Sequence, residues 1–207
     1  MQRPEGGGDS PWTHRLALIT AGATFLLILA GGVVTTTGAG MAVPDWPTTF
    51  GYNMFLYPWA KMTGGILYEH SHRLIGSLVG LLTLTLAAVL WAAEPRRWVR
   101  WLAALALFAV VVQGILGGLR VVLAAGQLAL LHGALAHAFF GLTASLALFT
   151  SRAWNARAAP LPVDAAGRLR GWCLLTTAAI YVQIVLGAVL THTGSRLDAH
   201  IGFAVLL

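Results

Sequence analysis

The chain has 207 residues, of which 57% are hydrophobic and 10% charged, and its formal net charge is +6 at pH 7. Soluble domains have about 25% charged residues, so this composition excludes an ordinary soluble domain and a disordered chain. The single cysteine, Cys173, excludes an intramolecular disulfide framework. Because about 20 apolar residues cross a bilayer, the composition predicts an all-α, polytopic membrane protein.

Five stretches without Asp, Glu, Lys or Arg divide the chain, and each has at least 19 residues. Each stretch is long enough for one membrane-spanning helix. The first is too long for the apolar region of a signal peptide and continues into a loop, so we expect it to be retained. The expected spans cover residues 16–36, 65–92, 101–123, 127–150 and 170–191.

Basic residues are concentrated on one side of these spans. The N-terminal segment, the turn at 94–100 and the linker at 151–170 hold nine of the 13 Lys and Arg residues. Alternating spans place these three segments together, and the positive-inside rule makes their side cytoplasmic. We therefore expect a cytoplasmic N-terminus and an outward-facing loop at 37–64. In a chain this apolar, positive charges in the loops set the orientation of the membrane spans rather than bind nucleic acid. No nucleic-acid partner is therefore expected.

The end of the first span resembles the end of the fifth. Residues 30–38 read AGGVVTTTG and residues 186–194 read LGAVLTHTG, with five identities at an offset of 156. The match predicts a duplicated four-helix unit, and a complete second copy would extend beyond Leu207. We therefore expect a C-terminally truncated fragment, with a short re-entrant or interfacial tail as the alternative. The expected parts are an N-terminal four-helix transmembrane bundle at 1–151, a cytoplasmic linker at 152–169 and the start of a second bundle at 170–207.

Ionisable residues inside membrane spans are costly and are therefore candidates for function. His72 lies about eight residues inside the second span and His132 about five residues inside the fourth, and both spans begin at the outer surface. Facing helices with one histidine each can hold a planar macrocycle and supply both axial ligands of its iron. Interhelical hydrogen bonding is the alternative, and it is favoured for His137. His14, at the cytoplasmic edge, is expected to be solvated.

A carboxylate and a guanidinium stand close to His72 in the sequence. Glu69 precedes His72 by three residues and Arg73 follows Glu69 by four, so Glu69 shares a helix face with each of them. The acid next to a candidate ligand favours a chemical role. A same-helix ion pair between Glu69 and Arg73 is the alternative.

Several segments together resemble the haem A synthase family. They are TGAGMAVPDWP at 37–47, EHSHRLIG at 69–76, LHG at 131–133, and LGA and THTG within 186–194. The resemblance covers residues 15–207. It implies two pseudo-symmetric four-helix bundles in a bacterial-type plasma membrane. It also implies oxidation of the C8 methyl of haem O to a formyl group, which gives haem A for cytochrome c oxidase.

The resemblance also implies a set of site residues in the N-terminal bundle. His72 and His132 match the axial ligands of the substrate haem, and Glu69 matches the catalytic carboxylate beside the reacting methyl. Such a carboxylate could stabilise positive charge or move a proton. Arg73, from the same motif, is expected to contribute to cofactor binding.

The C-terminal bundle is implied to hold a haem b that passes electrons. If residues 41–68 have no counterpart in the second copy, the offset of 156 shortens by 28 and pairs His72 with His200. His200 is then the expected first iron ligand of that haem, and His192 is its competitor. The partner ligand is expected beyond Leu207.

The first outer loop lacks the cysteine pair that some family members carry, so no thiol role is expected there. Two other functions remain open. One is a bis-His haem b electron carrier that does not modify haem. The other is a non-catalytic oxidase assembly protein with structural histidines. The partners implied by the resemblance are haem O, haem A, the lipid bilayer, a haem O synthase (protohaem farnesyltransferase) and an electron donor.

Overall fold

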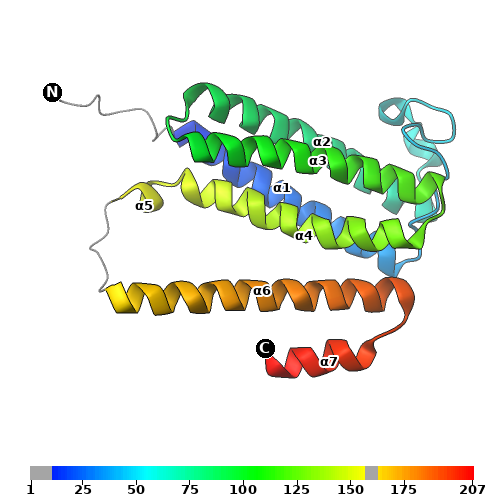
Figure 1. Cartoon of the computed structure of the whole chain (residues 1–207). Coiled ribbons are helices and arrows are strands. Elements are labelled where there is room, and N and C mark those ends of the chain that lie inside the picture. The colour runs from blue at the N-terminus through cyan, green and yellow to red at the C-terminus, as the bar shows by residue number, and fades with distance from the viewer. Residues whose placement is uncertain (1–10, 157–162) are drawn as a thin grey trace.

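The computed structural model describes residues 11–156 and 163–207, and all regular elements in these ranges are helices. The first ten residues and the middle of the expected linker, with Arg3, Arg157 and the two prolines Pro160 and Pro162, lie outside the described residues. The all-α prediction is confirmed. Four long helices form a bundle (Figure 1): α1 (Pro11–Thr36), α2 (Gly64–Ala93), α3 (Arg97–Val122) and α4 (Gly126–Phe149).

Each helix of the bundle packs against two others. α1 and α3 both lie between α2 and α4, so the four helices close a ring around one apolar core. Leu86 and Leu90 of α2 and Leu146 of α4 are fully buried in that core. Because lipid tails are as apolar as leucine, these side chains stabilise the bundle through close van der Waals packing rather than through removal from water.

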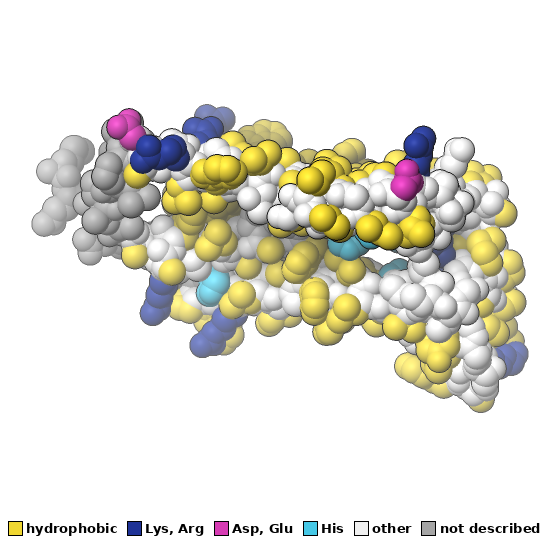
Figure 2. Space-filling model, turned by 90° about the horizontal axis from the view of Figure 1, so that it is seen from below, with side chains coloured by type: hydrophobic (Ala, Val, Ile, Leu, Met, Phe, Trp, Pro, Cys, Tyr) yellow, Lys and Arg dark blue, Asp and Glu magenta, His cyan; other side chains and the backbone are white. Residues whose placement is uncertain are grey.

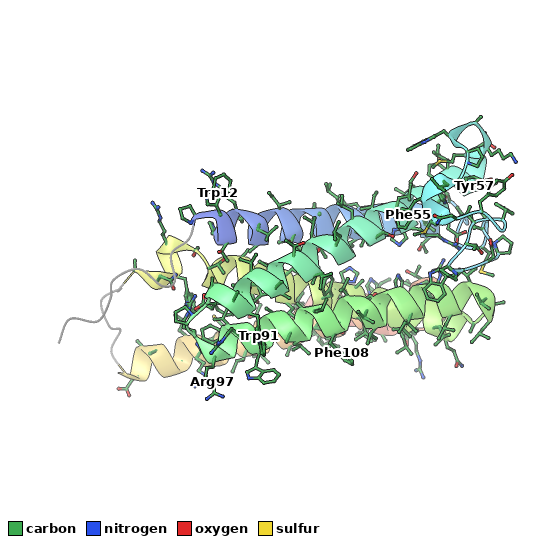
Figure 3. The ribbon with its side chains drawn as sticks, turned by 90° about the horizontal axis from the view of Figure 1, so that it is seen from above. Trp12, Phe55, Tyr57, Trp91, Arg97 and Phe108 are labelled. Carbon is green, nitrogen blue, oxygen red and sulfur yellow. The ribbon has the colours of Figure 1, made fainter. Side chains whose placement is uncertain are left out.

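The outer surface of the bundle is apolar as well. Phe108 is 66% exposed and projects outward from the middle of α3 (Figure 3). Lys and Arg side chains gather towards the two ends of the molecule (Figure 2). Five helices are long and apolar enough to cross a membrane. With the apolar surface facing lipid and charges at the ends, the chain is an integral membrane protein.

Three further helices follow the bundle: α5 (Arg152–Asn155), α6 (Val163–Thr193) and α7 (Leu197–Leu206). α6 lies along α4, and α7 folds back along α6 (Figure 1). α6 begins at Val163 rather than at 170, so it includes the last part of the expected linker. Asp164 in its first turn favours that early start, because a negative charge stabilises a helix N-terminus. None of the side chains described from 164 to 207 is fully buried.

A long loop joins α1 to α2 at one end of the bundle. It contains two short 3₁₀ helices, Met54–Leu56 and Trp59–Lys61, and a cis peptide bond between Trp46 and Pro47. Phe55 and Tyr57 of this loop lie at the opposite end of the bundle from Trp12, Trp91 and Arg97 (Figure 3). The loop is therefore remote from the basic turn between α2 and α3, as the charge pattern predicts.

Candidate functional site

Two histidines meet inside the bundle near the end that carries the long loop. His72 comes from α2 and His132 from α4, and their ring centroids are 6.5 Å apart with the planes at 85°. The structure thus brings the two imidazoles close together, as their similar depths predict. Their role as iron ligands stays a prediction.

Each of these rings packs on a glycine of a neighbouring helix. A Cβ placed on Gly31 of α1 would lie 3.1 Å from Cε1 of His72, and one on Gly117 of α3 would lie 3.1 Å from Cε1 of His132. Contacts this short are tighter than most side chains tolerate. Glycine within a helix costs about 1 kcal/mol relative to alanine, so the close approach of the rings accounts for its presence at both positions.

The second ring nitrogens of this pair are buried without a partner. Nδ1 of His72 and Nδ1 of His132 make no hydrogen bond within the described parts of the chain. The backbone carbonyls of Leu27 and Gln113, one turn before the two glycines, lie beside the rings but outside hydrogen-bonding geometry. Metal-bound histidines commonly direct their second N–H to such a carbonyl.

The histidine pair fits the axial positions of a haem. A metal–imidazole bond is about 2 Å long, so two rings that share one metal place their centroids roughly 6 Å apart. The observed 6.5 Å agrees with this spacing. The described residues contain no group of three or more His, Cys, Asp or Glu that could hold a bare ion. A macrocycle brings its own four nitrogens, so two protein ligands are sufficient.

Glu69 is 3% exposed, and both of its carboxylate oxygens accept hydrogen bonds. Oε1 accepts from Arg73 Nη2 at 2.7 Å, and Oε2 accepts from the Val43 backbone N–H at 2.8 Å. The same-helix ion pair considered as an alternative is therefore formed. The catalytic role of Glu69 stays a prediction beside it.

Arg73 fastens the long loop to α2. Its Nη1 donates to the carbonyls of Asp45 and Thr48 at 2.6 and 3.1 Å, and its Nη2 also donates to the Val43 carbonyl at 2.8 Å. A guanidinium used in this way holds backbone groups that would otherwise be unpaired. Its expected contribution to cofactor binding stays a prediction.

His70 makes the second attachment of the loop. Its ring is 1% exposed, its Nδ1 lies 3.1 Å from the Thr49 hydroxyl, and the Tyr57 ring packs against it at 5.1 Å between centroids. His70 therefore points away from His72, and it is engaged by the loop.

Asp45 organises the turn that follows it. Its carboxylate accepts hydrogen bonds from the N–H groups of Phe50 and Gly51 at 2.7 and 2.9 Å and from the Thr48 hydroxyl. Partial burial alone would raise the pKa of the carboxyl, but these hydrogen bonds together outweigh it. The pKa of Asp45 therefore lies below its usual value of 3.8.

The second half of the chain repeats the histidine–glycine contact. A Cβ on Gly187 of α6 would lie 3.2 Å from Cε1 of His200 in α7. Gly31 and Gly187 are the residues that the internal repeat aligns, so His200 makes the same glycine contact as His72. Gln183 Nε2 lies 3.1 Å from Nδ1 of His200. The role of His200 as an iron ligand stays a prediction.

His192 has different surroundings. Its Nε2 would lie 3.7 Å from a Cβ on Gly133, so it lies against α4 of the first bundle. The hydroxyl of Tyr181 also bridges these helices, donating to the Ala134 carbonyl at 3.3 Å. Histidine side chains are visible between apolar side chains in the view from below (Figure 2). The contacts therefore favour His200 over His192 as the counterpart of His72.

Sequence reasoning missed one charged residue at this end of the bundle. Arg120, in the last turn of α3, donates from Nη2 to the Gly40 carbonyl at 2.8 Å. The sequence does contain a sign of this residue, because Arg120 is the single charged residue between two charge-free stretches at 101–119 and 121–151. An isolated ionisable residue within an apolar stretch is by default a candidate for function.

Comparisons with known proteins show which proteins the chain is similar to. Residues 14–200 match the profile of a family described as "Cytochrome oxidase assembly protein". A protein of Shouchella clausii named "Heme A synthase" is 31% identical over 88% of this chain and 60% of its own length. Proteins of the same name from Geobacillus kaustophilus and Lysinibacillus sphaericus are 28% and 30% identical, over 87% and 83% of this chain and 56% and 55% of their own lengths. The chain thus spans at most 60% of these relatives. No solved structure matches.

Proposed function

The chain belongs to the cytochrome oxidase assembly protein family, and from this membership we propose that it functions in haem A synthesis. The α1–α4 bundle binds haem O between His72 and His132, and the C8 methyl of that haem is oxidised to a formyl group. The observation that carries this proposal is the buried pair of imidazoles 6.5 Å apart. The shared name of the curated relatives supports the reaction.

The bound haem supplies the redox-active iron, and the chain supplies position and surroundings. His72 and His132 hold the iron through Nε2. Gly31 and Gly117 let both rings approach it. The attachment of the loop through Arg73 closes the outer end of the bundle and excludes water from the site.

In this proposal, Glu69 is the acid–base group at the macrocycle edge. Each oxygen of Glu69 accepts one hydrogen bond, from Arg73 or from the Val43 N–H, and each keeps a further lone pair that can take a proton. A buried carboxylate with two donors is held in one orientation, which is the preorganisation that charge stabilisation needs.

The remaining parts of the proposal concern the second half of the chain and its surroundings. His200 is the first ligand of a haem b that passes electrons to the substrate haem. The chain is divided into a bundle at 1–151, a linker at 152–169 and the start of a second bundle at 170–207. The N-terminus is cytoplasmic, a haem O synthase delivers the substrate, and an electron donor reduces the haem b. Conversion of the methyl to a formyl group removes four electrons, so the reaction also requires an external oxidant that accepts them.

One observation favours a bis-His electron carrier instead. Both oxygens of Glu69 already accept hydrogen bonds that fasten the loop, so the carboxylate has a structural explanation without any chemistry. An electron carrier needs the histidine pair and the closed bundle but no acid–base group.

The first experiment is a reduced-minus-oxidised visible spectrum, with a pyridine haemochrome assay, on the purified chain in detergent. We expect a low-spin bis-His spectrum in the wild type that is lost in both His72→Ala and His132→Ala. Absence of haem from a folded wild type would contradict the proposal. Haem A in extracts of cells that also make haem O separates the enzyme from the carrier, which leaves haem O unchanged.

Glu69→Gln tests the catalytic role, and Thr49→Val is its matched control. Thr49→Val loosens the same loop by removing the partner of His70 but leaves the Glu69 carboxylate in place. We expect Glu69→Gln to bind haem and to lose haem A formation, while Thr49→Val keeps it. Full haem A formation by Glu69→Gln would remove the role.

A further inference from the structure

Arg120 is a half-buried cation whose hydrogen-bonding capacity is mostly unused. Its single side-chain hydrogen bond within the described residues goes from Nη2 to the Gly40 carbonyl. A guanidinium has five N–H donors and remains charged in proteins. Arg73, on the facing side of the same site, donates four hydrogen bonds. The two arginines therefore differ: Arg73 is occupied by the loop, and Arg120 is available to a ligand.

Arg120 lies at the outer edge of the space between the two histidines. It follows Gly117, on which the His132 ring packs, by three residues, which places it on the same face of α3 and one turn of about 5 Å further out. Its charge acts on both His72 and His132. A planar ligand held by the two rings therefore presents one of its edges to this guanidinium.

Arg120 forms no salt bridge with a carboxylate among the described residues. Glu69 is close enough to attract it, but the salt bridge of Glu69 is made with Arg73. A guanidinium away from bulk water favours an anion with two oxygens, which it can bind in bidentate fashion.

We propose that Arg120 binds a propionate carboxylate of the tetrapyrrole held between His72 and His132, and so determines which edge of the macrocycle faces outward. The inference rests on the proposed haem site. The propionates are the anionic groups of a haem, and the C8 methyl shares a pyrrole ring with one of them. Anchoring that propionate at Arg120 keeps the methyl in the outer part of the site, where Glu69 lies.

The test compares ferric protohaem with its dimethyl ester, which has the same ring and iron but no carboxylates. Both are titrated into the haem-depleted full chain in a non-ionic detergent, and binding is followed by the low-spin Soret band. We expect the wild type to bind the free acid at least about tenfold more tightly than the ester, because a charge-assisted pair is lost. This comparison of two ligands uses the wild-type chain alone, so its result does not depend on whether a variant folds.

Arg120→Gln should weaken binding of the free acid about tenfold or more and leave binding of the ester within about twofold. Arg120→Lys, which keeps the charge but not the bidentate geometry, should be intermediate. Arg97→Gln is the matched control, since Arg97 is an exposed arginine at the other end of α3. It should change neither affinity. The reduction potential of the bound haem should fall in Arg120→Gln alone, because a nearby positive charge favours the ferrous state.

The outcomes separate this inference from the proposed function. If the wild type binds acid and ester equally, or if Arg120→Gln weakens both equally, Arg120 only holds the Gly40 carbonyl and the inference is wrong while the haem site stands. A third outcome is that an anionic phospholipid lowers the affinity for the free acid and for the ester equally, in the wild type but not in Arg120→Gln. The guanidinium then binds a lipid headgroup, and the propionate inference is wrong. If the wild type gives no low-spin complex with either compound, both this inference and the proposed function fail.

Discussion

A histidine ring packed on a helical glycine occurs in both parts of the molecule, but its surroundings differ. In the α1–α4 bundle, His72 faces a second histidine, and four helices close around the pair. In the α6–α7 pair, His200 lies on Gly187 at a similar distance but has Gln183 beside its ring. Two helices are therefore sufficient for the contact between a histidine ring and a glycine. A closed site with two neighbouring imidazoles needs four helices.

The largest expected effect tests whether only the closed site holds haem in this chain. His72→Ala and His132→Ala should each remove essentially all bound haem, because an axial ligand and its half of the pocket are lost together. His200→Ala should leave at least about four-fifths of the haem, since a single imidazole in an open site binds weakly. Haem per chain, measured by pyridine haemochrome, gives the comparison. Equal losses in all three variants would show that the two regions bind haem alike.

The next effect concerns the connections in the two regions. The loop between α1 and α2 is fastened by buried Arg73, whereas α6 and α7 are joined through Gly194 and Arg196, both with positive φ and both exposed. Arg73→Gln should destabilise the bundle by about 3 kcal/mol, because it leaves the Glu69 carboxylate buried without its charged partner. Arg196→Gln should change stability by less than about 0.5 kcal/mol.

Stepwise denaturation in mixed detergent, followed by circular dichroism, measures both changes. The double variant Glu69→Gln with Arg73→Gln is the control, since removing both charges should cost less than removing one. If Arg73→Gln has no more effect than Arg196→Gln, the loop is held by other contacts.

A third and smaller effect examines the glycines directly. Gly31→Leu should lower haem affinity by roughly tenfold to a hundredfold, because an added side chain displaces the His72 ring and overpacking typically costs about 1–3 kcal/mol. Gly32→Leu is the matched control, as a Cβ there has nothing within 4 Å. Gly187→Leu should leave the haem of the first bundle unchanged. Titration of haem into the depleted variants provides the affinities, and equal affinities of Gly31→Leu and Gly32→Leu would refute the role of the contact.

Much of this arrangement follows from the sequence because charge and hydropathy determine it. Charge-free stretches predict all five long helices, since a charge at the bilayer centre is costly. Equal depth predicts that His72 and His132 meet, because helices in a bundle run nearly parallel. The repeat pairs Gly31 with Gly187, and the structure gives both glycines the same kind of neighbour.

The contacts that the sequence could not predict depend on backbone atoms. Arg73 and Arg120 bind loop carbonyls, whose positions depend on the path of the loop rather than on any residue spacing. His14 was expected to be only solvated, but its Nδ1 has a protein partner as well: it lies 3.1 Å from the Ala147 carbonyl, in the last turn of α4. Polar side chains near helix ends thus find partners that spacing does not reveal.

The smallest expected effect is the pH dependence of the loop, which the α6–α7 connection should lack. The pKa of Asp45 is lower in the folded state than its usual value of 3.8, so its hydrogen bonds stabilise the fold above that value and are lost as pH falls through the folded pKa. Wild type should therefore exceed Asp45→Asn in thermal stability at pH 6, and the difference should shrink below about pH 4. It should amount to less than about 1 kcal/mol, because the carboxylate is only partly buried and solvent screens its charge. A difference that is constant from pH 6 to pH 3 would show that the turn is held by its shape rather than by the charge of Asp45.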